Sequence, residues 1–274
     1  VKKETKDSPP VKLVDRQGAR LWYKQDVDFR GKNWKPKPKL TILFQIVTPY
    51  AEVTPRAAIL STLFAMLYSD AMVETTYDAT TAGSSWSLAP SGDSFALTVS
   101  GYSDQLGRLL KQVVEPVVTC LKQKQKCMWA DPQRFEVMKD EMKRGFENSK
   151  KSSPHQRAAK RLGEIVAKKS WSTDRLLYEL SLSDVTLDAV AAHVTQLFER
   201  VFIEGFVHGN TSPDEAKKFL DIVTVALSPV ALPENERELQ EVLKLENGLI
   251  FAEAHTNPED TNHAIELYYQ VTSF

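Results

Sequence analysis

Two patterns of apolar residues share the chain and predict a mixture of strands and helices. Short apolar runs bounded by turn residues predict β-strands at 11–15, 19–24, 40–48, 84–89, 94–101 and 201–209. Longer segments predict helices at 55–69, 72–81, 104–126, 132–149, 154–168, 173–180, 186–198 and 213–226. Four of these helices begin with a capping side chain before a proline, at Thr54, Asp131, Ser153 and Ser212. Because strands and helices are mixed rather than strictly alternating, we expect an α+β fold with a largely antiparallel sheet and helices packed on one face.

The end of the chain repeats the pattern of its beginning. Gly18 and Gly248 each separate two apolar segments, and the strand-like run at 44–48 (FQIVT) resembles 269–272 (YQVT). A repeat at this large spacing indicates tandem domains rather than a solenoid. We therefore expect one full unit of a tandem αβ repeat at 11–230. Residues 231–274 would be a linker and the first, truncated strands of the following repeat.

Charge and hydropathy exclude some classes of partner. Residues 1–10 are polar and predict a disordered stretch or a linker; they begin without Met, as an internal piece of a longer chain would. Lys and Arg number 35 and Asp and Glu 36, for a net charge of −1, so we expect no nucleic-acid partner. No apolar run approaches the roughly 20 residues that cross a bilayer, so we expect no membrane partner. We expect an intracellular location, in the cytosol, with an organelle as the alternative.

The two cysteines, Cys120 and Cys127, fall in a predicted helix, seven positions apart. Seven helical residues rise by about 10 Å, too far for a disulfide within one helix. We therefore expect two reduced thiols, which favours a reducing compartment.

The sequence contains no recognisable catalytic motif. Neither HExxH nor its inverse HxxEH occurs, and His263 opens an HxxE with Leu267 where the second His should be. His263 lies in a predicted strand, so its side chain and that of Glu266 would point to opposite faces. The segments GYSDQLG and AGSSWS are not nucleophile elbows, and no Gly-rich phosphate loop appears.

Charged residues crowd two predicted helices without a site being evident. The acidic residues of one helix alternate with Lys139, Lys143 and Arg144 at spacings of three and four, which favours solvated ion pairing; they are Asp131, Glu136, Asp140, Glu141 and Glu147. The basic stretch 143–169 could recognise polyanions or acidic substrates, but a solvated pair of helices is the favoured interpretation. From the residues alone, the chain is an α+β domain with an apparent tandem partner.

Several segments in order resemble one family. They are LWYKQDVDF, PKLTILFQIVTPYAEVTPRAAILSTLFAMLYSDAM, AGSSWSLAPSGDSFALTVSGYSDQ, DPQRFEVMKDEMKRGFENSKKSSPHQRA, VTLDAVAAHVTQLFERVFIEGFVHGN and HAIELYYQ. Together they resemble the third domain, and the start of the fourth, of the insulysin- and pitrilysin-type zinc metallopeptidases, the inverzincin family that includes insulin-degrading enzyme. The resemblance covers about residues 12–274, and no single motif carries it.

The resemblance implies a supporting role in a larger enzyme. Such peptidases consist of four homologous αβ domains in two halves that close around a peptide-sized chamber, and zinc is bound by HxxEH and a downstream Glu in the N-terminal domain. The implied partners are the catalytic N-terminal half of the same parent chain and its peptide substrates. Association into a homo-oligomer is compatible with this resemblance. The zinc would lie in the parent's N-terminal domain, with no cofactor in this fragment.

The chain departs from the catalytic repeat where the zinc helix would lie. The stretch Arg56–Leu67 offers only small or apolar residues, Ser and Thr in place of His, His and Glu, so we expect it to be core. Glu141 would lie on the helix that supplies the third ligand, and one carboxylate cannot hold catalytic zinc. We therefore predict no catalytic and no metal-binding residue, and assign no substrate-binding residue; basic side chains such as Lys143, Arg144, Lys150 and Lys151 could contribute to peptide contacts.

Two other functions are compatible with the sequence. A scaffold or pseudoprotease built from inactive repeats would have no HxxEH anywhere in the parent chain. A self-sufficient enzyme using His263 and Glu266 would require a bound metal.

Overall fold

The computed structural model describes residues 8–26, 38–123, 126–227, 229–237, 243–245, 248, 250–252 and 261–271. The linker predicted at 1–10 therefore lies mostly outside the described residues. The helices are α1 Pro55–Ala71, α2 Val73–Thr81, α3 Ser103–Lys122, α4 Pro132–Ser149, α5 Pro154–Val166, α6 Thr173–Leu180, α7 Leu187–Glu199 and α8 Pro213–Leu227. A short 3-10 helix, η1, spans Glu234–Glu236.

One twisted sheet organises the strands. They are β1 Val11–Arg16, β2 Ala19–Gln25, β3 Lys39–Val47, β4 Ser85–Pro90, β5 Ser94–Tyr102, β6 Arg200–Gly209 and β7 Val230–Ala231. The order across the sheet is β1-β2-β6-β3-β5-β4, and the short β7 pairs with β6. Neighbours are antiparallel except where β6 meets β2 and β7. The predicted α+β fold with a largely antiparallel sheet is thus confirmed.

Strand β6 joins distant parts of the chain. It lies between β2 and β3, parallel to the first and antiparallel to the second, although about 150 residues separate it from β3 in sequence. Gly205 of β6 has no side chain, and a Cβ there would lie 2.6 Å from the ring of Phe44. This close approach lets Phe44 and Leu21, from the strands on either side of β6, fill the space beside it.

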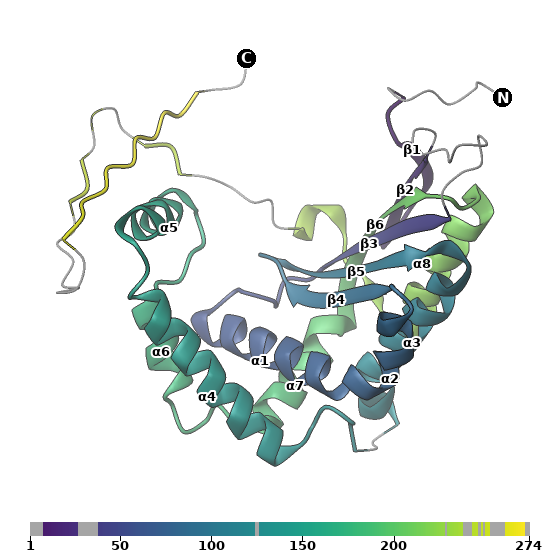
Figure 1. Cartoon of the computed structure of the whole chain (residues 1–274), viewed down its shortest axis with the longest axis horizontal. Helices are drawn as coiled ribbons and strands as arrows, with labels where there is room; N and C mark the ends of the chain where they lie inside the picture. The colour runs from purple at the N-terminus through teal and green to yellow at the C-terminus, as the bar shows by residue number, and fades with distance from the viewer. Residues whose placement is uncertain are drawn as a thin grey trace.

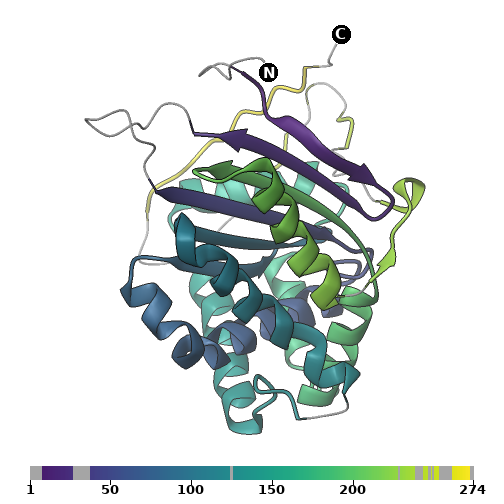
Figure 2. The ribbon, with the colours of Figure 1, turned by 90° about the vertical axis from the view of Figure 1, so that its right-hand side faces the viewer.

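The helices form layers on one side of the sheet. Helices α1, α3, α7 and α8 pack beneath it, and α4 and α6 pack against α1 farther from the sheet (Figure 1). Figure 2 shows α3 and α8 side by side in front of the strands. Alternate strand residues, such as Ile42, Phe44, Leu97 and Ile203, point into the core between sheet and helices, as the two-residue period of a strand requires.

Three of the four predicted capping side chains form a capping hydrogen bond. The side chains of Thr54 and Asp131 accept from the backbone N–H groups of Ala57 and Arg134, three residues on. Ser212 forms a reciprocal capping box with Glu215: its Oγ accepts from the Glu215 backbone N–H, and its own N–H donates to the Glu215 carboxylate. Ser153 makes no capping hydrogen bond.

The prediction for the cysteines is wrong. Helix α3 ends at Lys122 rather than at 126, so Cys127 lies outside it. The chain turns back, the two Cα atoms lie 5.0 Å apart, and Cys120 and Cys127 form a disulfide. The distance rule for one helix does not apply across this turn, and the inference of a reducing compartment loses its support.

The C-terminal segment forms no strand of a second repeat in the described residues. Residues 261–271, including His263, have no regular secondary structure and are exposed, which contradicts the predicted strand there. The amide side chain of Gln270 nevertheless bonds the backbone of Leu243 and Leu245, so the two segments run side by side near α5 (Figure 1). The linker predicted from residue 231 begins within β7, and the following residue, Leu232, donates its N–H to the carbonyl of Val201.

No single helix in the described ranges is long and apolar enough to cross a membrane. The bent pair of α1 and α2 passes the same test by length and composition, but most of the α1 side chains are buried in the core.

Candidate functional site

Helix α1 is the element where the sequence comparison with a zinc helix can be checked. Its side chains Ile59, Leu63, Phe64, Leu67 and Tyr68 are almost completely buried. Phe64 forms the centre of an aromatic cluster, with ring centroids 5.3–6.0 Å from those of Tyr68, Phe95, Trp129 and Phe198. The helix is core, as its sequence predicts.

Ser61 and His193 form a polar pair inside this core. The Ser61 hydroxyl lies 2.9 Å from Nε2 of His193 on α7 and donates a hydrogen bond to the carbonyl of Ala51 at 2.7 Å. The two residues are 0 % and 7 % exposed. Burial lowers the pKa of His193 to about 4, against which a backbone hydrogen bond to Ala57 acts weakly.

The hydrogen bonds of this pair do not fit nucleophilic catalysis. A hydroxyl has one proton, and that of Ser61 is donated to the Ala51 carbonyl. The contact with Nε2 of His193 at 2.9 Å therefore does not hold the hydroxyl proton in the way that a general base holds the proton of its nucleophile. With neither side chain open to solvent, the pair satisfies buried polar groups and links α1 to α7.

The other candidate ligands stay apart. His155 lies 3.5 Å from the Ser153 hydroxyl, His208 bonds the Lys24 carbonyl at 3.1 Å, and His263 is in the exposed C-terminal segment. Glu141 is exposed on α4. The pKa of Arg134 is raised mainly by its hydrogen bond to Asp70, and the charge of Glu141 is the smallest contribution to this rise. Among the residues that the structure describes, no three His, Cys, Asp or Glu side chains gather in a way that could hold a metal ion. The donors of a zinc site are therefore not assembled in this part of the chain.

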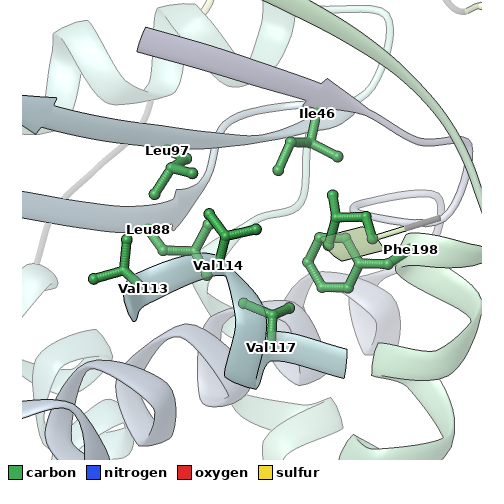
Figure 3. A pocket seen from close by; sticks show the side chains of 8 residues that line it. Ile46, Leu88, Leu97, Val113, Val114, Val117 and Phe198 are labelled. Atoms are coloured by element: carbon green, nitrogen blue, oxygen red, sulfur yellow. The ribbon is translucent and has the colours of Figure 1, made fainter. Parts of the chain in front are cut away.

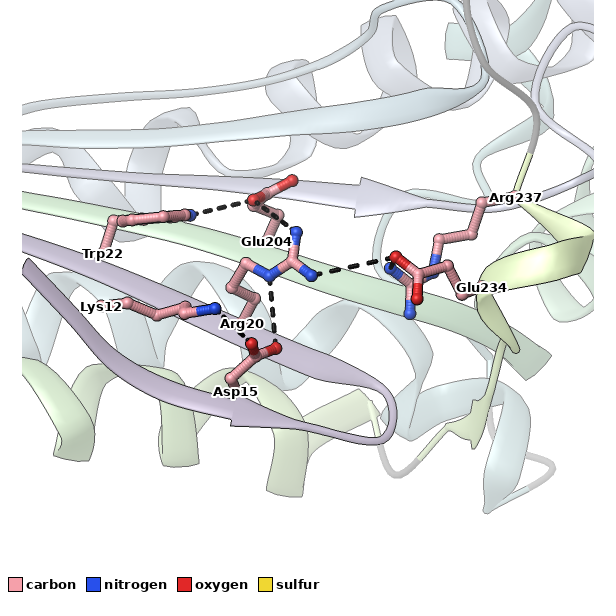
Figure 4. A network of polar contacts seen from close by, with 7 residues as sticks. All are labelled: Lys12, Asp15, Arg20, Trp22, Glu204, Glu234 and Arg237. Atoms are coloured by element: carbon pink, nitrogen blue, oxygen red, sulfur yellow. Dashed lines mark hydrogen bonds and ion pairs between the residues drawn. The ribbon is translucent and has the colours of Figure 1, made fainter.

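A cluster of polar side chains lies on the sheet face opposite the helices. Arg20 on β2 has Asp15 at 3.3 Å, Glu204 at 3.7 Å and Glu234 at 4.0 Å (Figure 4). Trp22 donates its indole N–H to Glu204 at 3.0 Å. Hydrogen bonding to Asp15 raises the pKa of Arg20, and the hydrogen bond from Lys12 is the main cause of the lowered pKa of Asp15. Every carboxylate here faces a cation, so none is poised as an acid or base.

This cluster holds the segment after α8 against the sheet. Arg237 lies over the ring of Phe202, 3.3 Å from its centroid, and pairs with Glu234 at 3.8 Å (Figure 4). A second ion pair joins Arg200 of β6 to Glu236 of η1 at 2.6 Å. The contacts therefore fix residues 230–237 on the open face of the sheet, which is an anchoring role.

Ion pairing accounts for part of the basic stretch that the sequence singles out. Arg144 pairs with Asp140 one turn earlier at 3.1 Å, as the i,i+4 spacing predicts, and Lys150 pairs with Asp174 at the start of α6. Lys143 and Lys151 are exposed. The four side chains do not converge on a pocket.

The core contains a small cavity, shown in Figure 3, with a volume of about 10 Å³. That is the lower limit for a single water molecule. Its lining is wholly apolar: Ile46, Leu88, Leu97, Val113, Val114, Val117, Phe198 and Leu227. Without polar groups it cannot orient a substrate.

Residues 1–179 match the family model described as the middle or third domain of peptidase M16. The chain belongs to the M16 peptidase family.

Curated M16 relatives agree with this assignment. Over 266 residues the chain is 30% identical to insulin-degrading enzyme of Homo sapiens, covering 95% of this chain and 24% of the relative. It is 28% identical to a nardilysin-like protein of Arabidopsis thaliana, covering 96% and 24%. A putative zinc protease, mug138, of Schizosaccharomyces pombe is 27% identical over 98% and 26%. The chain thus spans about a quarter of the length of the relatives it matches.

Solved structures share the M16 fold. Pitrilysin aligns with a TM-score of 0.69 at 19% identity, covering 84% of this chain and 23% of that one. A peptidase M16 inactive domain from Pseudomonas fluorescens aligns with a TM-score of 0.57 at 15% identity, covering 85% and 54%. The resemblance read from the sequence segments is therefore confirmed at the level of family and fold.

Sequence reasoning about this M16 domain missed two features. The Ser61–His193 pair joins residues 132 positions apart, and no motif marks it. The disulfide was excluded because both cysteines were placed in one helix. The lysine- and glutamine-rich stretch after Leu121 gives no stop signal that would have ended that helix earlier.

Proposed function

We propose that the chain is a non-catalytic domain in the C-terminal half of an insulysin-like zinc metalloendopeptidase that degrades peptides. In this role it forms part of the wall of the substrate-enclosing chamber and supports the catalytic half. The observation that carries the proposal is helix α1: within a family of zinc peptidases, its stretch 56–67 consists largely of buried apolar side chains and contains no His, Cys, Asp or Glu.

The proposal extends to the parent protein. Zinc would be held by an HxxEH helix and a Glu elsewhere in the parent, and the fragment alone would be inactive. Residues 11–230 would be the third repeat, and 231–274 the linker and first strands of the next. Exposed apolar side chains at Ile265, Leu267 and Tyr269 support the last point, because a strand that belongs to a larger sheet would bury alternate residues of this kind.

A scaffold or pseudoprotease made of inactive repeats is the second candidate. The lack of assembled metal donors in the described residues is compatible with it, and it too needs a packed αβ unit. The sequence of the full-length transcript separates the two. An HxxEH upstream of these residues supports the peptidase, and a parent without that motif in any repeat overturns it in favour of the scaffold.

A biochemical experiment tests the supporting role. The upstream part of the parent is expressed without its C-terminal half, and its hydrolysis of a quenched fluorescent peptide is measured before and after addition of a C-terminal half that contains this domain. We expect hydrolysis to need both parts and to be lost on chelation of zinc. Full activity of the upstream part alone contradicts the supporting role, and activity of the 274-residue chain alone contradicts the non-catalytic one.

A further inference from the structure

The end of helix α3 is not explained by its local sequence. The residues after Leu121 read KQKQK, and Lys and Gln are good helix formers. No Gly follows for many residues, and the next Pro is Pro132. The C-cap residue Gln123 has φ −87° and ψ 0°, on the right-handed side of the map, so no left-handed residue ends the helix. Helix α3 nevertheless ends at Lys122.

The disulfide supplies the missing cause. Cys120 lies within the last turn of α3 and its partner is Cys127, seven residues on, with the Cα atoms 5.0 Å apart. If the helix continued to Cys127, seven residues would separate these atoms by about 10 Å, beyond the reach of a disulfide. The bond and a longer α3 therefore exclude each other.

The position of Cys127 is linked to the core through Trp129. Trp129 is 1 % exposed, and its ring meets that of Phe64 on α1 edge-on at 5.3 Å. The carbonyl of Cys127 accepts from the N–H of Ala130 at 3.0 Å, which closes a tight turn around the tryptophan. Movement of Cys127 along a longer helix would therefore displace Trp129.

The buried indole of Trp129 lacks a hydrogen-bond partner among the described residues. Such an N–H group carries a desolvation cost that is not recovered. Directly after it, Asp131 caps α4, and Arg134 binds Asp70 of α1 through two N–H groups. These contacts hold the start of α4 whichever way the preceding turn is arranged.

The bond is within reach of solvent on one side. Cys120 is partly exposed on α3, whereas Cys127 is buried. Cys120 is therefore the half of the bond that a thiolate from solution would reach first.

We propose that Cys120 and Cys127 form a reversible thiol–disulfide switch that sets the length of α3 and the burial of Trp129. A soluble dithiol reduces the bond: one thiolate attacks Sγ of Cys120 and releases the Cys127 thiolate, and the second thiolate then displaces Cys120. The dithiol leaves as a cyclic disulfide, and the cysteines gain two electrons and two protons in total. Helix α3 is then free to continue beyond Lys122, and Trp129 leaves the core. The inference is independent of the proposed function.

Tryptophan fluorescence of the 274-residue chain tests the switch. The oxidised protein and the protein treated with a dithiol are compared without denaturant, with free thiols titrated in each. We expect no free thiol in the first and two in the second. Reduction should shift the emission to the red and increase acrylamide quenching several-fold, while the far-UV circular dichroism still melts in one cooperative transition.

Two matched variants assign the signal. Trp171→Phe should keep the redox-dependent change and Trp129→Phe should lose it, since Trp171 lies elsewhere, donating to the Glu52 carbonyl. The variant with both Cys120→Ala and Cys127→Ala should resemble the reduced protein in either condition. If Trp129→Phe does not fold, hydrogen exchange of the peptide over 127–135 replaces it, with faster exchange expected near Trp129 after reduction.

Three results would overturn the switch. One is two free thiols in the air-oxidised protein. Another is emission and quenching that do not change on reduction. The third is loss of the cooperative transition on reduction, which would make the bond a requirement for folding rather than a switch.

Discussion

The first and last segments of the chain share a sequence pattern but not a structure. In the first, Phe44 of β3 is 0 % exposed, and the strand has β6 on one side and β5 on the other. In the last, the matching residue Tyr269 is 81 % exposed, and residues 261–271 form no strand. An alternating apolar pattern thus predicts the preference of a segment, whereas its partners decide whether the preference is realised.

The partners of the first segment come from far along the chain. Strands β5 and β6, at 94–102 and 200–209, supply both neighbours of β3, and β6 separates β3 from β2. Equivalent partners for 261–271 would have to follow it in a second repeat. Four predictions test this contrast between packed and unpacked parts of the chain, from the largest expected effect to the smallest.

The largest difference is expected between Phe44→Ala and Tyr269→Ala. Removal of the buried Phe44 ring should lower the free energy of unfolding by about 3–5 kcal/mol. Removal of the exposed Tyr269 ring should change it by less than about 0.5 kcal/mol. Urea denaturation of the two variants measures both values. Similar losses for the two would mean that the C-terminal segment is packed.

The second largest effect is expected in the pH dependence of stability, where a buried and an exposed histidine are compared. His193 is buried and His263 exposed. Folding lowers the pKa of His193 from about 6.5 to about 4, so the native state favours the neutral ring. The resulting stability is present above pH 6.5 and is lost as the pH falls towards 4, by up to about 3 kcal/mol.

Urea denaturation between pH 7 and pH 4 checks this sign. The stability of His193→Gln should fall less steeply with decreasing pH than that of the wild type, whereas His263→Gln should follow the wild type. Parallel pH curves for His193→Gln and the wild type would show that His193 is not held neutral by the fold.

The matched glycines give a smaller contrast. Gly18 has φ +81°, and a Cβ there would lie 2.9 Å from Cβ of Ala231 on β7. Gly248 has φ +77° with open space around it. Gly18→Ala should destabilise the fold by about 1–2 kcal/mol from the left-handed backbone alone, with the contact adding to this. Gly248→Ala strains only a turn outside the packed unit, and a global stability loss as large as that of Gly18→Ala would count against the contrast.

The smallest effect concerns the charges that anchor residues 230–237. Arg20→Met should lower the free energy of unfolding by no more than about 1 kcal/mol, because the cluster is near the surface and screened. The loss should shrink in high salt. Thermal melts at low and high salt measure it. Arg20 also lies over the Phe202 ring, 5.7 Å from its centroid, and a loss that does not depend on salt would point to this packing rather than to ion pairing.

Local signals in the sequence predict most of the fold and less of the site. Capping residues and prolines predict the helix starts, and β-branched runs predict the strands, because both depend on neighbours along the chain. The insertion of β6 between β2 and β3, and the contact of Ser61 with His193, depend on tertiary packing that no local pattern encodes. The predicted end of α3 is wrong for a related reason. Residues 122–126 favour a helix locally, but the disulfide between Cys120 and Cys127 is incompatible with a helix that continues to Cys127.

Zinc analysis tests the central claim most directly. The 274-residue chain is purified, supplied with one equivalent of zinc, and its metal content measured after gel filtration, alongside the full-length parent. The account predicts zinc on the parent and no stoichiometric zinc on the chain, since α1 has only core side chains where a zinc helix would have ligands. One zinc per chain, retained by the fragment alone, would contradict the assignment of a non-catalytic M16 domain.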